Sequence, residues 1–115
     1  MRRSRQALER AIGAADRPGQ KAQAHYELAV FHDNRGREKA AIPHYEQALS
    51  LGLEIETRAE CLAWLASSLF KTGRHDEALS RLDQSMSIAP PDLAAWLAGL
   101  SRRITRAIAS GSNQD

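Results

Sequence analysis

The sequence predicts an all-α protein built as a stack of antiparallel helix pairs. Three observations support this. Apolar residues recur three and four positions apart, glycines and prolines lie mainly between these periodic segments, and no segment alternates apolar and polar residues as a strand would. The connections are short, so successive helices should pack antiparallel. The six expected helices span residues 3–16, 20–34, 38–51, 55–72, 75–88 and 92–109.

The first three expected helices each have apolar residues at helical spacing. Leu8 and Ile12 share one face of the first helix, together with Ala11 and Ala15. Leu28 and Phe31 are among the apolar residues of the second helix. In the third helix, the residues expected to face inward are Ala41, Tyr45, Ala48 and Leu49.

The last three expected helices carry longer apolar stripes. The fourth begins either at a capping box from Thr57 to Glu60 or one turn earlier, near Glu54. Its inward residues are Leu62, Leu65, Ala66 and Leu69, and those of the fifth helix are Ala78, Leu79, Leu82 and Met86. The sixth helix follows two prolines, with Asp92 as its expected N-cap. Its stripe comprises Leu93, Leu97, Leu100, Ile104 and Ile108, of which the last two are expected to overhang the stack.

The composition indicates one folded domain over residues 1–110, with a disordered tail at 111–115. Of the 115 residues, 43% are hydrophobic and 26% charged, which excludes disorder of the whole chain. The single cysteine excludes an internal disulfide. No apolar run approaches the roughly 18 residues that a membrane span needs, and the N-terminal residues lack the features of a secretory signal. We therefore expect a small cytoplasmic protein.

Two segments of the chain resemble each other. Residues 62–86 repeat the pattern of residues 25–49 with an offset of 37 positions. Small residues and a glycine coincide, which suits two helices that approach closely around a left-handed turn. The matched pairs are Leu28 with Leu65, Ala29 with Ala66, Gly36 with Gly73, Ala41 with Ala78, and Tyr45 with Leu82.

This pattern resembles the tetratricopeptide repeat, a helix-turn-helix unit of about 34 residues. In this sequence Leu53 stands where the family usually has a proline, and His25 and His32 replace large apolar or aromatic residues. The stretch GREKAAIPHYEQALSLGL also resembles short bacterial proteins of this family. The resemblance implies a right-handed superhelix with a flanking helix at 1–19, repeats at 22–55 and 56–91, and a capping helix at 92–110.

The resemblance further implies a non-catalytic module that binds a peptide, a helix or another protein on the concave face of the stack. No catalytic motif, cofactor motif or metal motif occurs in the sequence. The first helices of the repeats would line the concave face. The residues implied there are Gln23, Tyr26, Val30, Asp33, Asn34, Glu60, Ala63, Trp64, Ser67, Phe70 and Lys71.

Several alternatives stay open at this point. The end helices could join copies of the chain into a scaffold, or terminal arginines could bind nucleic acid. These arginines are Arg2, Arg3, Arg5, Arg102, Arg103 and Arg106. Trp64 points away from the expected core of its helix, so it either anchors a partner or is covered by the sixth helix or a neighbouring side chain. His25 and His32 are expected to pack, Cys61 to be unreactive, and His44 and His75 to be solvated.

Overall fold

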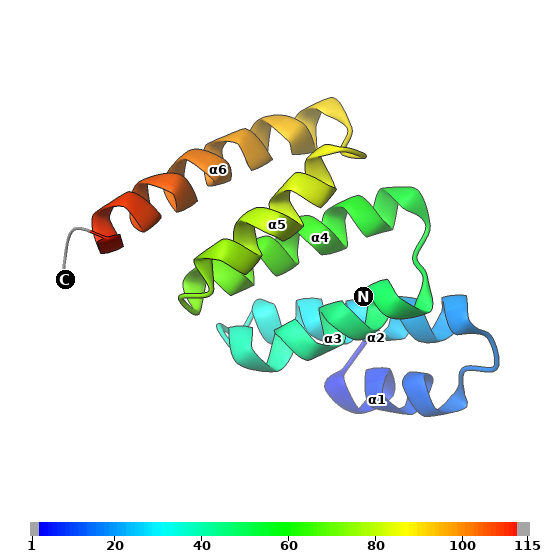
Figure 1. Cartoon of the computed structure of the whole chain (residues 1–115). Helices are drawn as coiled ribbons and strands as arrows, with labels where there is room; N and C mark the ends of the chain where they lie inside the picture. The colour runs from blue at the N-terminus through cyan, green and yellow to red at the C-terminus, as the bar shows by residue number, and fades with distance from the viewer. Residues whose placement is uncertain (1–2, 113–115) are drawn as a thin grey trace.

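The structure, a computed structural model, describes residues 3–112, which form six α-helices (Figure 1). No strand occurs within that range, in agreement with the predicted fold class. The helices are α1 (Arg5–Ala14), α2 (Pro18–Asp33), α3 (Glu38–Leu51), α4 (Ile55–Lys71), α5 (His75–Met86) and α6 (Pro91–Ser112).

Two helices begin at a proline, earlier than predicted. Pro18 lies in the first turn of α2, where the absent N–H would have had no partner within the helix. Pro91 starts α6 for the same reason, one residue before the expected N-cap. The predicted tail is also partly wrong, because α6 continues through Ser112. Residues 113–115 lie outside the described part of the chain.

The helices form an elongated stack in which neighbours in sequence are neighbours in space (Figure 1). The most extensive contacts are between α2 and α3 and between α4 and α5, and α3 packs on α4 to join the two pairs. At one end α1 packs on α2, and at the other end α6 packs on α5 and α4. The stack measures 49 by 28 by 25 Å. Each element thus contacts only near neighbours, as in a solenoid.

The two helix pairs share the same turn. Gly36 and Gly73 have φ angles of +70° and +85°, a conformation that favours glycine because it lacks a Cβ. The next residues, Arg37 and Arg74, donate their N–H groups to carbonyls in the last turn of the preceding helix, at 3.0 and 2.8 Å. These bonds satisfy carbonyls that the helix end would otherwise leave unpaired.

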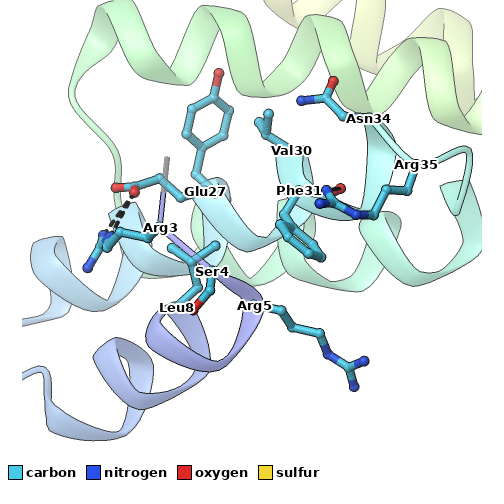
Figure 2. A pocket seen from close by; sticks show the side chains of 10 residues that line it. Arg3, Ser4, Arg5, Leu8, Glu27, Val30, Phe31, Asn34 and Arg35 are labelled. Carbon is cyan, nitrogen blue, oxygen red and sulfur yellow. Dashed lines mark hydrogen bonds and ion pairs between the residues drawn. The ribbon is translucent and has the colours of Figure 1, made fainter. Parts of the chain in front are cut away.

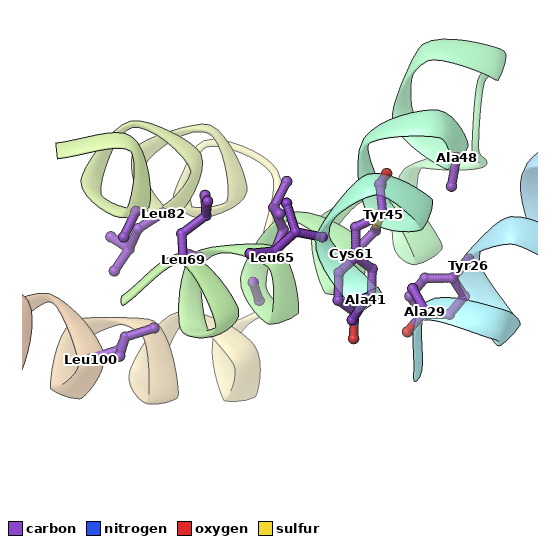
Figure 3. Close-up of a cluster of buried hydrophobic side chains, with 14 of the residues drawn as sticks. Tyr26, Ala29, Ala41, Tyr45, Ala48, Cys61, Leu65, Leu69, Leu82 and Leu100 are labelled. Atoms are coloured by element: carbon purple, nitrogen blue, oxygen red, sulfur yellow. The ribbon is translucent and has the colours of Figure 1, made fainter. Parts of the chain in front are cut away.

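The core has the alternation of small and large residues that the repeat predicts (Figure 3). Large side chains, among them Tyr45, Leu65 and Leu82, are almost completely buried and fill the space between helices. The four matched alanines have no exposed surface, which is consistent with closely approaching backbones; they are Ala29, Ala41, Ala66 and Ala78.

The offset between the two repeats, 37 residues, is longer than the family's unit of about 34 residues. The connection between α3 and α4 accounts for this difference. Helix α4 begins at Ile55 with Glu54 as its N-cap, which confirms the earlier of the two predicted starts. Leu53 occupies the family's proline position and is buried in the core. Arg58 donates a hydrogen bond to the carbonyl of Leu53 at 3.0 Å, so this turn is tied to the first turns of α4.

The apolar stripe of α6 docks more fully than predicted. Leu97, Leu100 and Ile104 are almost completely buried, so the expectation that Ile104 overhangs the stack is wrong. Ile108 is half-buried against the same core. The reason is that α6 packs along α5 and also reaches α4.

Candidate partner-binding groove

Three aromatic side chains, each from a different helix, form a row that we call the aromatic row: Tyr26 of α2, Trp64 of α4 and Trp96 of α6. Trp64 Nε1 donates a hydrogen bond to the Tyr26 hydroxyl at 3.2 Å, and that hydroxyl donates to Glu60 Oε2 at 3.1 Å. The Trp64 and Trp96 rings meet edge to face, with centroids 5.0 Å apart. Helices that share few backbone contacts are thus joined through these side chains.

The environment of the aromatic row keeps Tyr26 neutral. Burial raises the pKa of its phenol well above the ordinary value, and the Glu60 carboxylate raises it further. The hydroxyl therefore stays a donor to Glu60 while it accepts from Trp64. Trp64 is half-buried beneath its neighbours, whereas Trp96 keeps 37% of its surface exposed. Trp96 of α6 thus covers part of the Trp64 ring, and Trp64 keeps some exposed surface.

A cavity of about 830 Å³, which we call the α1–α2 pocket, lies between the N-terminal segment and α2 (Figure 2). Leu8 and Val30 contribute apolar surface, and Tyr26 belongs both to this pocket and to the aromatic row. The remaining lining residues are Arg3, Ser4, Arg5, Glu27, Phe31, Asn34 and Arg35.

Arginines surround the α1–α2 pocket, and each has a partner within the chain. Arg3 forms an ion pair with Glu27 at 2.9 Å. The Arg35 guanidinium lies 3.6 Å from the centroid of the Phe31 ring and donates to the Phe31 carbonyl. Arg5 lies 3.4 Å from Glu9, which is also on α1. These are exposed contacts of small energy, so the arginines remain able to exchange them for a ligand.

The predicted groove residues are only partly brought together. Tyr26, Val30 and Asn34 line the α1–α2 pocket, and Glu60 and Trp64 lie at the aromatic row. Gln23, Ser67, Phe70 and Lys71 retain exposed surface, of which Gln23 donates a hydrogen bond to Glu27 and Phe70 contacts the His75 ring.

Two predicted groove residues have other roles. Asp33 accepts a 2.7 Å hydrogen bond from the hydroxyl of Tyr45, so its carboxylate joins α2 to α3. Ala63 has no exposed surface. It therefore offers nothing to a partner in this conformation, and its placement on the groove surface is corrected. The physical reason is that α4 is covered by helices on more than one side.

Comparison with known families agrees with the geometry. A family described as tetratrico peptide repeat matches residues 22–108, a range that runs from α2 into the last turns of α6. The chain belongs to the tetratricopeptide-repeat family. No curated protein matches the sequence. Members of the tetratricopeptide-repeat family generally mediate interactions between proteins and are generally not catalysts.

Membership of the tetratricopeptide-repeat family explains the position of the aromatic row. Helices α2 and α4 begin the two closely packed helix pairs, and α6 follows them in the stack. The sequence Ala-Trp-Leu-Ala occurs at 63–66 in α4 and again at 95–98 in α6. This repetition is the signal that identifies Trp96, which the sequence analysis did not include among the site residues.

Other pocket residues were also missed from the sequence. Arg3, Arg5 and Leu8 lie in the N-terminal flanking segment, which the repeat comparison did not cover, and the sequence analysis considered the two arginines only as possible nucleic-acid contacts. Phe31 and Arg35 stand four positions apart, a spacing that brings side chains together on a helix. This four-residue spacing indicates that the two side chains meet, but the same spacing is common on helix surfaces that bind no ligand.

Three histidines meet between α2 and α3. His25 and His44 have stacked rings and face each other through their Nδ1 atoms at 3.0 Å, and His32 stacks on His44 with centroids 5.9 Å apart. The expected packing of His25 and His32 agrees with their burial. The expectation that His44 is solvated is wrong, because its ring is half-buried between the other two.

The single cysteine lies in the core between the repeats. Burial raises the pKa of the Cys61 thiol to about 12, so the thiolate is not populated near neutral pH. Its Sγ lies 3.5 Å from the Tyr45 carbonyl, to which it donates a weak hydrogen bond. The prediction that this cysteine packs without reacting agrees with these surroundings.

No three His, Cys, Asp or Glu side chains within residues 3–112 are placed so that they could hold a metal ion. Over the same range no helix is long and apolar enough to cross a membrane.

Proposed function

We propose that this protein is a non-catalytic interaction module that binds a segment of another protein on the face lined by α2, α4 and α6. The general role of the family supports the class of function. The single observation that carries the binding face is the aromatic row, which crosses all three helices and ends in the exposed ring of Trp96. Tryptophan is among the residue types that most often contribute a large share of a binding energy.

The proposed binding surface comprises the aromatic row, the α1–α2 pocket and the exposed residues between them. From the predicted set it retains Gln23, Tyr26, Val30, Asn34, Glu60, Trp64, Ser67, Phe70 and Lys71, and it adds Trp96. Glu60 lies at its centre as an exposed carboxylate that Tyr26 orients. The surface is therefore mixed in polarity, as transient protein interfaces generally are.

The test is affinity capture from the native host with immobilised protein, followed by quantitative mass spectrometry. Trp96→Ala removes the exposed ring of the aromatic row. Met86→Ala is a matched control, because Met86 on α5 is similarly exposed, 39% against 37%, but lies outside the row. We expect a set of proteins captured by the wild type and by Met86→Ala and depleted with Trp96→Ala.

Two results would contradict the proposal. The first is equal capture by all three immobilised proteins, which would place the binding surface elsewhere. The second is the absence of any protein enriched over an empty matrix. Circular dichroism of both variants checks that a lost capture does not reflect a lost fold.

The two alternative functions have less support. The end helix α6 buries its apolar stripe within the chain, which leaves little to join a second copy. The described terminal arginines belong to the N-terminal end of the stack or to α6 at the other end, and Arg2 lies outside the described residues (Figure 1). They therefore form no continuous basic surface for a nucleic-acid backbone. Light scattering and a salt titration of binding test these alternatives.

A further inference from the structure

We propose that the α1–α2 pocket receives an internal segment of the partner in which an aspartate or glutamate adjoins a large apolar residue. This inference rests on the proposed function and specifies the chemistry of its partner. The pocket combines two features that match such a segment: an apolar wall and an excess of positively charged side chains.

The apolar wall is made by residues of two helices. Leu8 of α1 lines the pocket but is only 2% exposed, so the accessible apolar surface comes from Val30 and Phe31 of α2, which are half-buried. The cavity of about 830 Å³ is within the range of ligand sites in proteins and exceeds the volume of one aromatic side chain. A large apolar side chain that enters would be removed from water on several sides.

The charge of the pocket favours a carboxylate. Three arginines and one glutamate line it, and Glu27 is already paired with Arg3. Arg35 lies over the Phe31 ring, at 3.6 Å from its centroid. The Arg5 side chain extends away from Phe31 and pairs with Glu9, and the Arg3–Glu27 pair lies apart from both (Figure 2). A carboxylate of the partner could therefore pair with a guanidinium of the pocket, while the adjoining apolar side chain of the partner packs against Phe31.

The Arg35 side chain is held in position by contacts within the chain. One of its nitrogens donates to the Phe31 carbonyl and the plane of its guanidinium lies over the Phe31 ring, which restrains the side chain before a ligand arrives. A guanidinium has five N–H donors, so others remain for a carboxylate. The arginines surround the pocket and do not converge on one point, so a free C-terminus has no special advantage over an internal segment.

A basic partner and a nucleic acid fit less well. A lysine or arginine in the partner would meet like charge at Arg5 and Arg35. A phosphate backbone could pair with the arginines, but it has no apolar group that would cover Leu8, Val30 and Phe31. The partner is therefore inferred to be a protein segment that combines both chemistries.

The experiment selects peptides from a displayed random library without free C-termini, using the full chain as bait. Arg5→Glu and Arg35→Glu each reverse one pocket charge. Arg10→Glu is the matched control, because Arg10 is an exposed residue of the same helix as Arg5 and does not line the pocket. Selected peptides are resynthesised, and their affinities for all four proteins are measured by fluorescence anisotropy.

We expect the wild type and Arg10→Glu to enrich peptides with an acidic residue next to a Phe, Leu, Ile, Met or Trp. Each pocket variant should weaken these peptides about tenfold or more, because a charge-assisted contact is replaced by like-charge repulsion. Circular dichroism verifies that the variants are folded.

Three outcomes would overturn the inference. Enriched peptides without acidic residues, or affinities that Arg5→Glu and Arg35→Glu leave unchanged, would reject the acidic partner while preserving the proposed function. Failure to enrich any peptide, with tight Arg35-dependent binding of a labelled single-stranded DNA, would reject both and favour the nucleic-acid alternative.

Discussion

The Nδ1 atoms of His25 and His44 lie 3.0 Å apart, so one proton held between them joins α2 to α3. One ring must donate and the other must accept, which requires at least one neutral imidazole. His32 stacks on His44 and has an Nδ1 atom that is buried without a hydrogen-bond partner. Protonation of these rings would remove the shared bond and place like charges within a few ångströms of each other.

Charged groups on three sides face the histidine cluster. On α2 itself, Lys21 acts on His25 and lowers its pKa. From α1, Arg5 lowers and Glu9 raises the pKa of His32, and Glu9 also raises that of His44. The turn after α2 adds the positive charges of Arg35 and Arg37. Burial is the largest effect on each of the three histidines and lowers the pKa.

The first prediction is that acid destabilises the fold through these histidines. Because their pKa values in the folded chain lie below the ordinary 6.5, the unfolded chain binds more protons. The stabilisation is thus complete above pH 6.5 and decreases as the pH falls through the folded pKa values. Urea unfolding on either side of pH 6.5 measures this, and His44→Gln should flatten the dependence. His75→Gln, at the start of α5, is the control; a slope unchanged by His44→Gln would refute the assignment.

The second prediction concerns the close approach of α2 and α3. Ala41 has no exposed surface, so Ala41→Leu should overpack the contact and lower the free energy of unfolding by about 1–3 kcal/mol. Ala40→Leu introduces the same side chain one position away at an exposed site, and should change stability by about 0.5 kcal/mol or less. Urea unfolding compares the two. Equal stability of both variants would show that Ala41 does not limit the helix approach.

The third prediction concerns the turn of the second repeat. Gly73 has φ of +85°, so Gly73→Ala should cost about 1–2 kcal/mol through backbone strain, even though nothing lies within 4 Å of the added Cβ. Gly19 in the first turn of α2 also has open space but no positive φ. Gly19→Ala should therefore stabilise the protein slightly, by about 0.4–1 kcal/mol. Thermal unfolding shifts of opposite sign would support this, and shifts of the same sign would contradict it.

The fourth prediction concerns truncation after Pro91. Loss of α6 would expose the surface that Leu97, Leu100 and Ile104 cover, and each such side chain contributes about 1.5–3 kcal/mol when buried. We expect aggregation or partial unfolding, visible by light scattering and circular dichroism. A truncated chain that stays monomeric and equally stable would show that α6 contributes nothing to the core.

The sequence by itself determined the repeat. Matched alanines and glycines, such as Ala41 with Ala78 and Gly36 with Gly73, predict helix pairs with a left-handed turn, and the structure has both. These features are local or nearly so, because helical periodicity and turn chemistry act within a few residues. The order and approximate length of all six helices over residues 3–112 follow from the same signals.

Only the tertiary structure decided which side chains meet across helices. Nothing in the spacing of Tyr26, Trp64 and Trp96 predicts one aromatic row, because they become neighbours only when α2, α4 and α6 are stacked. The same holds for His44, which lies far along the chain from His25, and for the pocket that α1 forms with α2. Helix periodicity defines which face is buried, but the rotation and offset between packed helices determine which residues of those faces come into contact.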